Sequence, residues 1–310
     1  MKIAIIGAGA VGSVVAGVLA RGGLDVRLIE RNAKTVAHIA AHGLRLEGVR
    51  GSYVVRLPIH RDAPTADSVD LAVFCVKAYD TAAAAEQHAA LCAGGALAMS
   101  LQNGVGNVES LAARYGDERL LAGSTTLAAH VLAPGVVQHA ADGETVIGEA
   151  RGGLTPRLRE IAAAWTAAGL PARAVGDIRE ALWAKLCVNA AINPVAALLG
   201  VRNGELARAA SLRPLLEDVV REAVAAAAAL GVTLDAAAVI ARLWQVIADT
   251  RDNRASMLAD LAAGGRTEID AINGAVAAVG RARGLPTPVN DALTRLVQAA
   301  VERSRASDGA

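Results

Sequence analysis

Three polar residues lie four positions apart in an apolar segment: Lys185, Asn189 and Asn193, within residues 182–194. If this segment is an α-helix, one ammonium group and two carboxamides share a single stripe of its surface. The surrounding residues are mostly Ala, Leu, Val and Ile, and asparagine is unfavourable inside a helix unless a partner satisfies it. A helix face that meets only solvent usually carries Lys, Glu and Arg. The repeated asparagines therefore favour a polar ligand over the alternative, a solvated face.

An acidic residue further along the chain lies at a predicted helix start. Glu268 is flanked by Thr267 and Asp270, whose spacing fits a capping box. We therefore expect a helix to begin near Arg266, with Glu268 in its first turn, where the helix dipole favours a carboxylate. The alternative for Glu268 is a surface acid that only complements this dipole. Upstream, Ser256 could equally be an ordinary helix serine.

The amino-terminal region has the pattern of a dinucleotide-binding turn. Residues 3–6 form a short β-branched run, and residues 10–21 repeat valine and leucine at helical spacing. The turn between them reads Gly7, Ala8, Gly9, Ala10, Val11, Gly12. The glycines would allow a tight turn, close approach of a pyrophosphate and close packing of the helix on the strand. The alternative is a glycine-rich turn that binds nothing.

The end of the next strand carries two residues with opposite implications for the nucleotide. Residues 26–29 are apolar and are followed by Glu30 and Arg31. An acidic residue here usually binds the ribose hydroxyls of NAD, whereas an arginine accommodates the 2′-phosphate of NADP. These two adjacent residues leave the cofactor open between NADP(H), through Arg31, and NAD(H), through Glu30.

Two further apolar runs, at residues 69–76 and 96–101, end in polar residues. Lys77 follows the first and Asn103 lies just after the second. Ligands of a doubly wound sheet lie beyond the carboxyl ends of its parallel strands, which makes both residues candidate binding groups. The alternatives are a surface lysine and a turn asparagine.

The remaining pattern divides the chain into two domains. Residues 119–149 are β-branched with turn signals and predict extra strands that complete the sheet, partly antiparallel. A helix at 156–168 and a strand at 172–175 would close the first domain near Gly176 and Asp177. Strand signals nearly vanish beyond this point. We therefore expect an α/β Rossmann-type doubly wound domain at 1–176, followed by an all-helical substrate and catalytic domain at 177–310.

Composition narrows the classes of ligand. Of 310 residues, 54% are hydrophobic and 2% aromatic, and the formal net charge is +1, so nothing indicates nucleic acid or an anionic membrane as a partner. Cys75, Cys92 and Cys187 have no metal-site spacing, and their apolar surroundings suit reduced thiols. These features favour a cytoplasmic protein that binds a metabolite. The Ala and Leu of the helical half could serve either a homodimer face or its own core.

Taken together, these motifs resemble those of the ketopantoate reductase (2-dehydropantoate 2-reductase) family. The similar segments span the chain: 7–12, Cys75-Val76-Lys77-Ala78, 102–106, 182–194, Asn203-Gly204-Glu205-Leu206, Ser256-Met257-Leu258 and 266–270. The resemblance implies a hydride transfer from NADPH to the C2 ketone of ketopantoate, which gives (R)-pantoate for pantothenate and coenzyme A biosynthesis. It also implies that NADPH lies on the glycine turn, with Arg31, Lys77 and Asn103 as further cofactor contacts.

For the chemical step, the resemblance implies that Lys185 is the general acid and that Glu268 orients it. Substrate would be bound by a polar shell consisting of Asn103, Asn189, Asn193, Asn203 and Ser256. Desolvation would lower the pKa of such a lysine and a nearby carboxylate would raise it again. Two alternatives stay open: a dehydrogenase of the same family that acts on another 2-oxo or D-2-hydroxy acid, and a non-catalytic NADP(H)-sensing regulatory protein.

Overall fold

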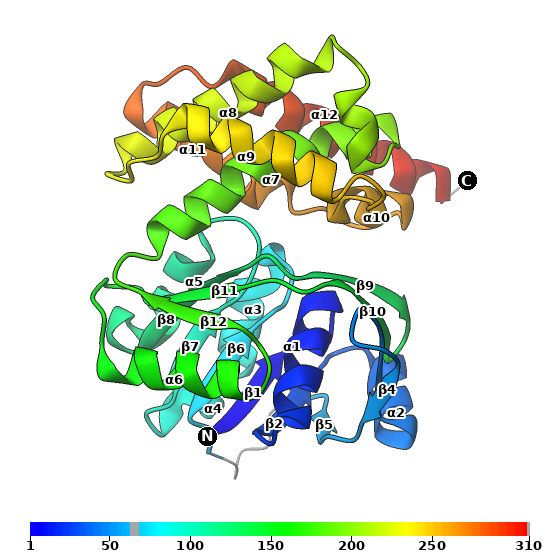
Figure 1. Ribbon diagram of the computed structural model, residues 1–310, viewed down its shortest axis with the longest axis vertical. Helices are drawn as coiled ribbons and strands as arrows, with labels where there is room; N and C mark the ends of the chain where they lie inside the picture. Colours follow the sequence, from blue (N-terminus) through cyan, green and yellow to red (C-terminus); the bar gives the residue numbers. More distant parts are fainter. Residues whose placement is uncertain (63–67, 309–310) are drawn as a thin grey trace. The chain divides into compact units, whose positions relative to one another are not determined.

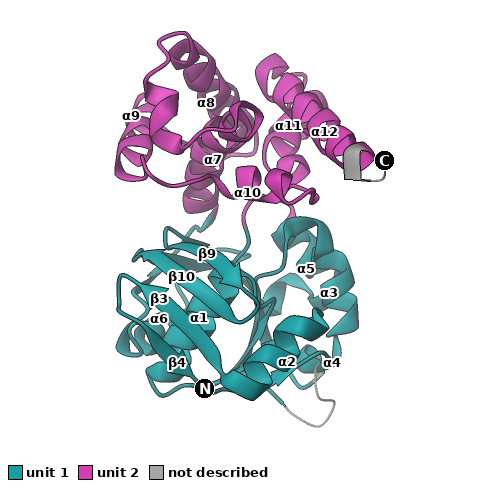
Figure 2. Cartoon of the chain, turned by 90° about the vertical axis from the view of Figure 1, so that its right-hand side faces the viewer, with its two compact units in different colours: residues 1–102, 107–178 teal, residues 103–106, 179–310 magenta. Residues whose placement is uncertain are grey.

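The computed structural model describes residues 1–62 and 68–308 and divides into two compact units (Figure 2). Unit 1 comprises residues 1–102 and 107–178, and unit 2 comprises residues 103–106 and 179–310. The main division follows Ile178, close to the boundary expected at Gly176. In addition, the short segment 103–106, which contains Asn103, belongs to unit 2. The role of residues 177–310 as the substrate and catalytic domain stays a prediction.

Unit 1 is built on an eight-stranded sheet in the order β12-β11-β8-β7-β6-β1-β2-β5 (Figure 1). Its strands are β1 (Lys2–Ile6), β2 (Asp25–Ile29), β5 (Ile59–His60), β6 (Leu71–Phe74), β7 (Leu97–Ser100), β8 (Leu120–Thr125), β11 (Thr145–Glu149) and β12 (Ala172–Val175). All neighbours are parallel except β8 and β11, which pair antiparallel. The sheet confirms the predicted doubly wound fold class.

Helices cover both faces of this sheet. Alternate residues of β1 separate the two layers, because Ile3 and Ile5 pack with one set of helices while Ala4 and Ile6 pack with the other. The first set is α1 (Ala10–Arg21) and α6 (Pro156–Ala167); the second is α3 (Thr81–Gln87), α4 (Ala90–Ala93) and α5 (Asn107–Tyr115). Strands buried on both faces must be apolar throughout, which explains the continuous runs seen in the sequence.

A second, four-stranded sheet corrects one sequence expectation. Its order is β4-β3-β10-β9, with bounds Tyr53–Val55, Leu44–Gly48, Val136–Ala141 and Ala128–Ala133. Residues 119–149 therefore do not all complete the main sheet: β8 and β11 join it, but β9 and β10 pair with β3 instead. Leu44, Leu46 and Val137 from the small sheet pack in the same cluster as α1. The remaining short helices are α2 (Ala33–His42), η1 (Ala78–Asp80) and η2 (Asp117–Arg119).

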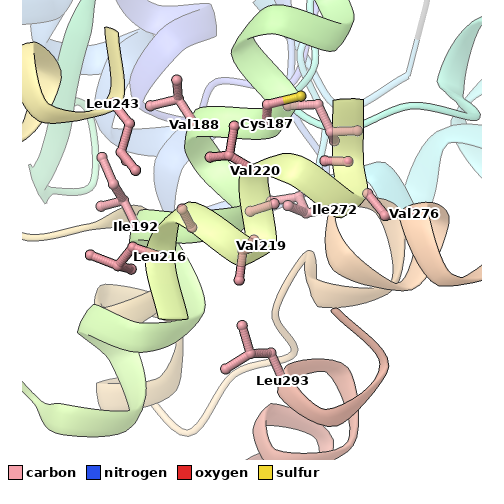
Figure 3. Close-up of a cluster of buried hydrophobic side chains, with 14 of the residues drawn as sticks. Cys187, Val188, Ile192, Leu216, Val219, Val220, Leu243, Ile272, Val276 and Leu293 are labelled. Atoms are coloured by element: carbon pink, nitrogen blue, oxygen red, sulfur yellow. The ribbon is translucent and has the colours of Figure 1, made fainter. Parts of the chain in front are cut away.

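Unit 2 is helical, as predicted, and α7 runs through its core. Its helices are α7 (Arg179–Leu199), η3 (Asn203–Ala207), α8 (Leu212–Ala229), α9 (Ala236–Asp249), α10 (Ser256–Ala262), η4 (Ile269–Ala271), α11 (Asn273–Arg283) and α12 (Pro288–Asp308). Figure 3 shows side chains of α7, α8, α9, α11 and α12 meeting in one apolar cluster. Of the described helices, only α7 has the length and hydropathy of a membrane span, but 67% of that stretch is buried inside the protein. It is the core helix of this unit.

The helix expected to begin at Arg266 is a second correction. The chain forms only the short helix η4 after Glu268, and α11 starts at Asn273. No side-chain cap is made at η4, and the buried hydroxyl of Thr267 has no hydrogen-bond partner among the described residues. The Thr267 and Asp270 capping box is therefore absent, and Glu268 does not lie in the first turn of an α-helix.

Candidate active site

The polar stripe lies along α7 and is not a solvated helix face. Asn193 is only 7% exposed, and Lys185 and Asn189 are half-buried. Cys187 and Val188 of the same helix point into the apolar core of unit 2 (Figure 3). Polar groups drawn into such surroundings require polar partners. The stripe is therefore suited to hold a polar ligand.

The ammonium group of Lys185 is set to release a proton near neutral pH. Burial lowers the pKa of Lys185 to about 8 from the usual 10.5, and the carboxylate of Glu268 raises it against this trend. Glu268 is itself only 5% exposed. A lysine with a pKa just above neutrality is mostly protonated at pH 7 and still gives up its proton readily. The pair therefore has the properties of a general acid and the carboxylate that maintains its charge.

The short helix η4 joins two segments that are distant in sequence. The carbonyl oxygen of Glu268 accepts hydrogen bonds from the N–H groups of Ala271 at 3.0 Å and Ile272 at 3.1 Å. The carbonyl oxygen of Ala271 in turn accepts one from the N–H of Val105 at 3.0 Å. The segment containing Asn103 is thus hydrogen-bonded to the turn that follows Glu268. Asn103 and Glu268 come from separate sequence motifs, and they therefore lie on segments of unit 2 that are hydrogen-bonded to each other.

The other candidate substrate residues have different surroundings. Asn203 begins η3, and its Nδ2 donates to Thr250 Oγ1 at 2.9 Å while its buried Oδ1 has no partner among the described residues. Ser256 is the exposed first residue of α10. No hydrogen bond in the described part of the chain links either residue to Lys185. Their roles in substrate binding stay predictions.

The glycine turn of unit 1 has the shape that a dinucleotide requires. Gly7 has a φ of +103°, and a Cβ on Gly12 would lie 2.0 Å from the carbonyl oxygen of Gly7. By contrast, a Cβ on Gly9 would have nothing within 4 Å. The first amide groups of α1 receive no side-chain cap, and its first turn has no acidic residue. Backbone N–H groups above an open position can bind phosphate, so the turn fits a pyrophosphate.

Glu30 and Arg31 have separate partners at the end of β2. The Glu30 carboxylate accepts hydrogen bonds from the N–H of Ala8 at 2.9 Å and of Asn32 at 2.8 Å, so it supports the glycine turn. Arg31 is 73% exposed and forms a bidentate pair with Asp80, at 3.2 and 2.8 Å. Sequence reasoning missed Asp80, which is the last residue of η1. The arginine is therefore paired with an acidic side chain of the same unit.

Lys77 lies in a loop that Gln102 holds in place. The Gln102 Nε2 donates to the carbonyl oxygen of Val76 at 2.9 Å and to Thr81 Oγ1 at 2.7 Å. Its Oε1 accepts from Ser100 Oγ at 3.1 Å. Gln102 is buried, and sequence reasoning did not single it out. The signal was present, because a carboxamide directly after an apolar strand must find partners within the fold.

Cysteine and metal chemistry receive no support at this site. Burial raises the pKa values of Cys75 and Cys187 to about 12 and of Cys92 to about 11. These thiols are protonated near neutral pH and are therefore poor nucleophiles. Among the side chains that the structure describes, no three His, Cys, Asp or Glu residues are grouped to hold a metal ion.

The chain is similar to proteins of known family along almost its whole length. Residues 3–152 match the family model "Ketopantoate reductase PanE/ApbA", and residues 177–302 match "Ketopantoate reductase PanE/ApbA C terminal". The 2-dehydropantoate 2-reductase of Halobacterium salinarum is 38% identical over 301 residues, covering 97% of this chain and 99% of that protein. The enzyme of the same name from Archaeoglobus fulgidus is 37% identical, with coverage of 96% and 97%.

Solved structures agree with these matches. The PanE/ApbA family ketopantoate reductase from Ralstonia eutropha JMP134 superimposes with a TM-score of 0.90 and 36% identity, covering 98% of this chain and 100% of that one. A D-mandelate dehydrogenase solved with NADH and anilino(oxo)acetate has a TM-score of 0.95 at 29% identity, with coverage of 98% and 99%. Both family models and the curated relatives agree, and the chain belongs to the ketopantoate reductase family.

Proposed function

We propose that this protein reduces 2-dehydropantoate (ketopantoate) to (R)-pantoate with NADPH, a step in pantothenate and coenzyme A biosynthesis. The observation that carries the proposal is the pairing of a desolvated Lys185 with the buried carboxylate of Glu268. A protein that only senses a nucleotide has no need for a proton donor of this kind. The pair therefore favours catalysis over the regulatory alternative.

In the proposed reaction, the residues of the chain supply the proton and the alignment. The nicotinamide, when bound, supplies a hydride to the C2 carbonyl carbon of the substrate. As the carbonyl π bond opens, negative charge develops on oxygen, and the Lys185 Nζ gives its proton to that oxygen to form the alcohol. Glu268 then faces a neutral lysine, which regains a proton from solvent. One hydride and one proton together convert the ketone into the secondary alcohol.

The carboxamides bind and orient the substrate in this proposal. Asn189 and Asn193 lie one and two turns beyond the lysine on α7, where their N–H groups can donate to carboxylate or hydroxyl oxygens of a 2-oxo acid. Asn103, Asn203 and Ser256 complete the proposed polar shell. A polar shell of this kind fixes which carbonyl face meets the hydride.

Gly104 provides a test of how the segment containing Asn103 is placed. Gly104 has a φ of +83°, and an added Cβ would lie 2.5 Å from the carbonyl oxygen of Ala271. We expect Gly104→Ala to displace the segment from η4 and to lower kcat/KM for ketopantoate by about tenfold to a hundredfold. Steady-state kinetics at fixed NADPH would measure this change.

Gly106→Ala is the matched control, because Gly106 has a φ of +92° but a Cβ there would contact nothing within 4 Å. It adds backbone strain of about 1 kcal/mol without a clash. Similar losses of activity in the two variants would show that the contact with Ala271 does not matter.

Cofactor preference follows from Arg31 and Asp80 in our proposal. We propose that Arg31 binds the 2′-phosphate of NADPH, supported by Lys77. We also propose that NADH can bind, because the Glu30 carboxylate accepts one backbone N–H on each oxygen and keeps lone pairs for ribose hydroxyls. Arg31→Ala should raise KM for NADPH by about tenfold to a hundredfold, since a charge-assisted contact is worth about 1.5–3 kcal/mol. KM for NADH should stay nearly constant.

Asp80→Asn tests the same idea in the opposite direction. Removing the competing carboxylate frees Arg31, so KM for NADPH should fall by about twofold to fivefold, the range for an exposed ion pair. Initial rates with NADPH and NADH, measured side by side, would check both variants. Equal effects on the two cofactors would contradict the assignment of Arg31.

The substrate itself is tested by initial rates with several 2-oxo acids. We expect the highest kcat/KM with ketopantoate and NADPH, and lower values with pyruvate, 2-oxoisovalerate and the 2-oxo acid that corresponds to mandelate. A higher kcat/KM for the 2-oxo acid of mandelate with NADH would favour the alternative function, a dehydrogenase of the same family that acts on another 2-oxo acid. Tight NADPH binding without oxidation by any of these acids would favour the sensor.

We further propose a cytoplasmic location, and a homodimer stays a prediction.

A further inference from the structure

A proline inside α7 leaves one backbone carbonyl without its helical partner. In an α-helix, the carbonyl oxygen of each residue accepts a hydrogen bond from the N–H four positions later. Pro194 occupies that position for Ala190 and has no N–H. Ala190 is fully buried and directly follows Asn189 of the polar stripe. This carbonyl therefore needs a donor from elsewhere in the protein.

The donor is Asn273, the first residue of α11. Its Nδ2 donates to the carbonyl oxygen of Ala190 at 2.9 Å and to Asn290 Oδ1 at 3.0 Å. Asn273 and Asn290 are both 0% exposed. The bond to Ala190 replaces, with a side chain, the helical hydrogen bond that Pro194 removes.

The orientation of the Asn273 carboxamide is fixed by its neighbours. Asn290 Nδ2 meets two acceptors, Glu222 Oε2 at 2.8 Å and the carbonyl oxygen of Val219 at 3.2 Å, so its Oδ1 must face Asn273. Glu222 also accepts from the N–H of Asn290 at 2.9 Å, which holds the start of α12. Asn273 thus faces two acceptors and can satisfy them only with its NH2 group.

The same residue lies at the end of the turn that begins with Glu268. The Glu268 carbonyl accepts from Ala271 and Ile272, which fixes the backbone up to the residue before Asn273. Ile272 and Val276, on either side of Asn273, are packed in the core cluster with Cys187 (Figure 3). The Asn273 bond therefore connects the segment that carries the acid to the helix that carries the lysine.

We propose that Asn273 is a positioning residue that holds α7 in register with the turn at Glu268, and so aligns Lys185, Asn189 and Asn193 for reaction. This inference rests on the proposed function for its kinetic consequences. The rival explanation is purely structural: Asn273 only satisfies a buried carbonyl. The two explanations differ in what happens when the carbonyl is satisfied by another donor.

The first experiment removes the Asn273 donor. Asn273→Leu should lower kcat for ketopantoate by about tenfold to a hundredfold, as expected for a small misalignment, while KM for NADPH changes less than about twofold. The alkaline limb of the kcat profile should move to lower pH, because a displaced Glu268 no longer supports the protonated lysine. Thr294→Val, a buried polar-to-apolar change on α12, is the control and should preserve both the rate and the profile.

The second experiment supplies a different donor to Ala190. Pro194→Ala restores the missing N–H, so Pro194→Ala alone should keep kcat within about twofold of the wild type, because a carbonyl oxygen accepts two hydrogen bonds. In the double variant with Asn273→Leu, thermal stability should recover but kcat should stay low. Recovery of kcat together with stability would overturn the inference. An equal loss of kcat in Pro194→Ala alone and in Asn273→Leu would also overturn the inference, because the alignment of α7 would then depend on the proline.

A readout without substrate separates this inference from the proposed function. The chain has four lysines, so 13C-labelled lysine gives few signals, and that of Lys185 is identified by its loss in Lys185→Met. NMR titration should show a lower pKa for Lys185 in the double variant than in the wild type. An unchanged or higher pKa would overturn the inference even if another 2-oxo acid were the substrate. Failure of the wild type to reduce any 2-oxo acid would instead overturn only the proposed function.

Discussion

Replacement of Lys185 by alanine is expected to lower kcat for ketopantoate by about a hundredfold to ten-thousandfold, the range for loss of a positioned general acid. The physical reason is that burial brings the pKa of Lys185 down to about 8, so its ammonium group can release a proton near neutral pH. Lys185→Arg should be nearly as inactive, because a guanidinium keeps its charge but does not release its proton near neutral pH. Stopped-flow or steady-state NADPH oxidation would measure both variants.

The fold of Lys185→Ala should survive the change. The folded protein binds the lysine proton less tightly than the unfolded chain does, because the pKa of Lys185 falls to about 8 from 10.5. The charged lysine therefore costs stability below pH 8, and this cost disappears as the pH rises to about 10.5. At pH 7 the loss of this cost opposes the destabilisation from leaving the buried Glu268 carboxylate without the ammonium group, so the variant should still fold and melt cooperatively.

Lys34→Ala is the matched control for this prediction, since Lys34 is exposed on α2. It should preserve kcat, Tm and NADPH affinity. If Lys185→Ala kept kcat within about threefold of the wild type, Lys185 could not be the general acid.

Local patterns predicted those elements whose cause is local. The bounds of α1 and β12 match the predicted residues 10–21 and 172–175. In α1, helical spacing of valine and leucine combines with glycines at both ends, so the chain neighbours alone define the helix. The α7 stripe was visible for the same reason, because residues four positions apart share a face in any helix.

Strand partners were not predictable from the same kind of pattern. The β-branched segments and turn signals in residues 119–149 indicated strands. They did not indicate that β10 pairs with β3, nearly a hundred residues earlier, rather than with the main sheet. The residue pattern of a strand indicates which of its faces is buried, but it does not indicate which strand is its neighbour. The choice is decided by packing of Leu46 and Val137 against α1.

The turn at Glu268 shows a local signal that tertiary structure overrides. Thr267 and Asp270 have capping-box spacing, but the hydroxyl of Thr267 is buried and does not cap a helix. The Ala271 carbonyl oxygen instead binds Val105 of a distant segment. That long-range bond occurs together with a short helical turn in place of a regular α-helix start.

Two site residues had no signal in the sequence. Asp80 is 49 positions from Arg31, and Asn273 is 83 positions from Ala190. The sequence does show that Pro194 deprives one carbonyl of its donor, but any buried amide could have replaced it. Only the fold identifies which one does.

Glu268→Gln should produce the clearest change in pH dependence. The variant keeps the shape of the side chain but removes the charge that raises the pKa of Lys185, while burial continues to lower it. If Lys185 is the proposed general acid, only its protonated form is active, and the alkaline limb of the kcat profile should move to lower pH. At pH 7.5 we expect kcat to fall by about threefold to twenty-five-fold, the loss of protonated lysine when a pKa of about 8 drops by roughly one to two units. Activity should partly recover at lower pH, where the lysine is again protonated.

Asp270→Asn separates this effect from a general loss of negative charge in the turn. Asp270 lies two residues from Glu268, is exposed, and contacts Arg266 and Gln298, so its charge is screened by solvent. The control should leave the alkaline limb in place, and full profiles of both variants from about pH 5.5 to 9.5 would show the difference. If Glu268→Gln lowered kcat equally at every pH, Glu268 would act on the substrate rather than through the proton of Lys185. A limb that moved to higher pH would mean that Glu268 destabilises the charged lysine, contrary to the electrostatics of an opposite charge held close in a buried site.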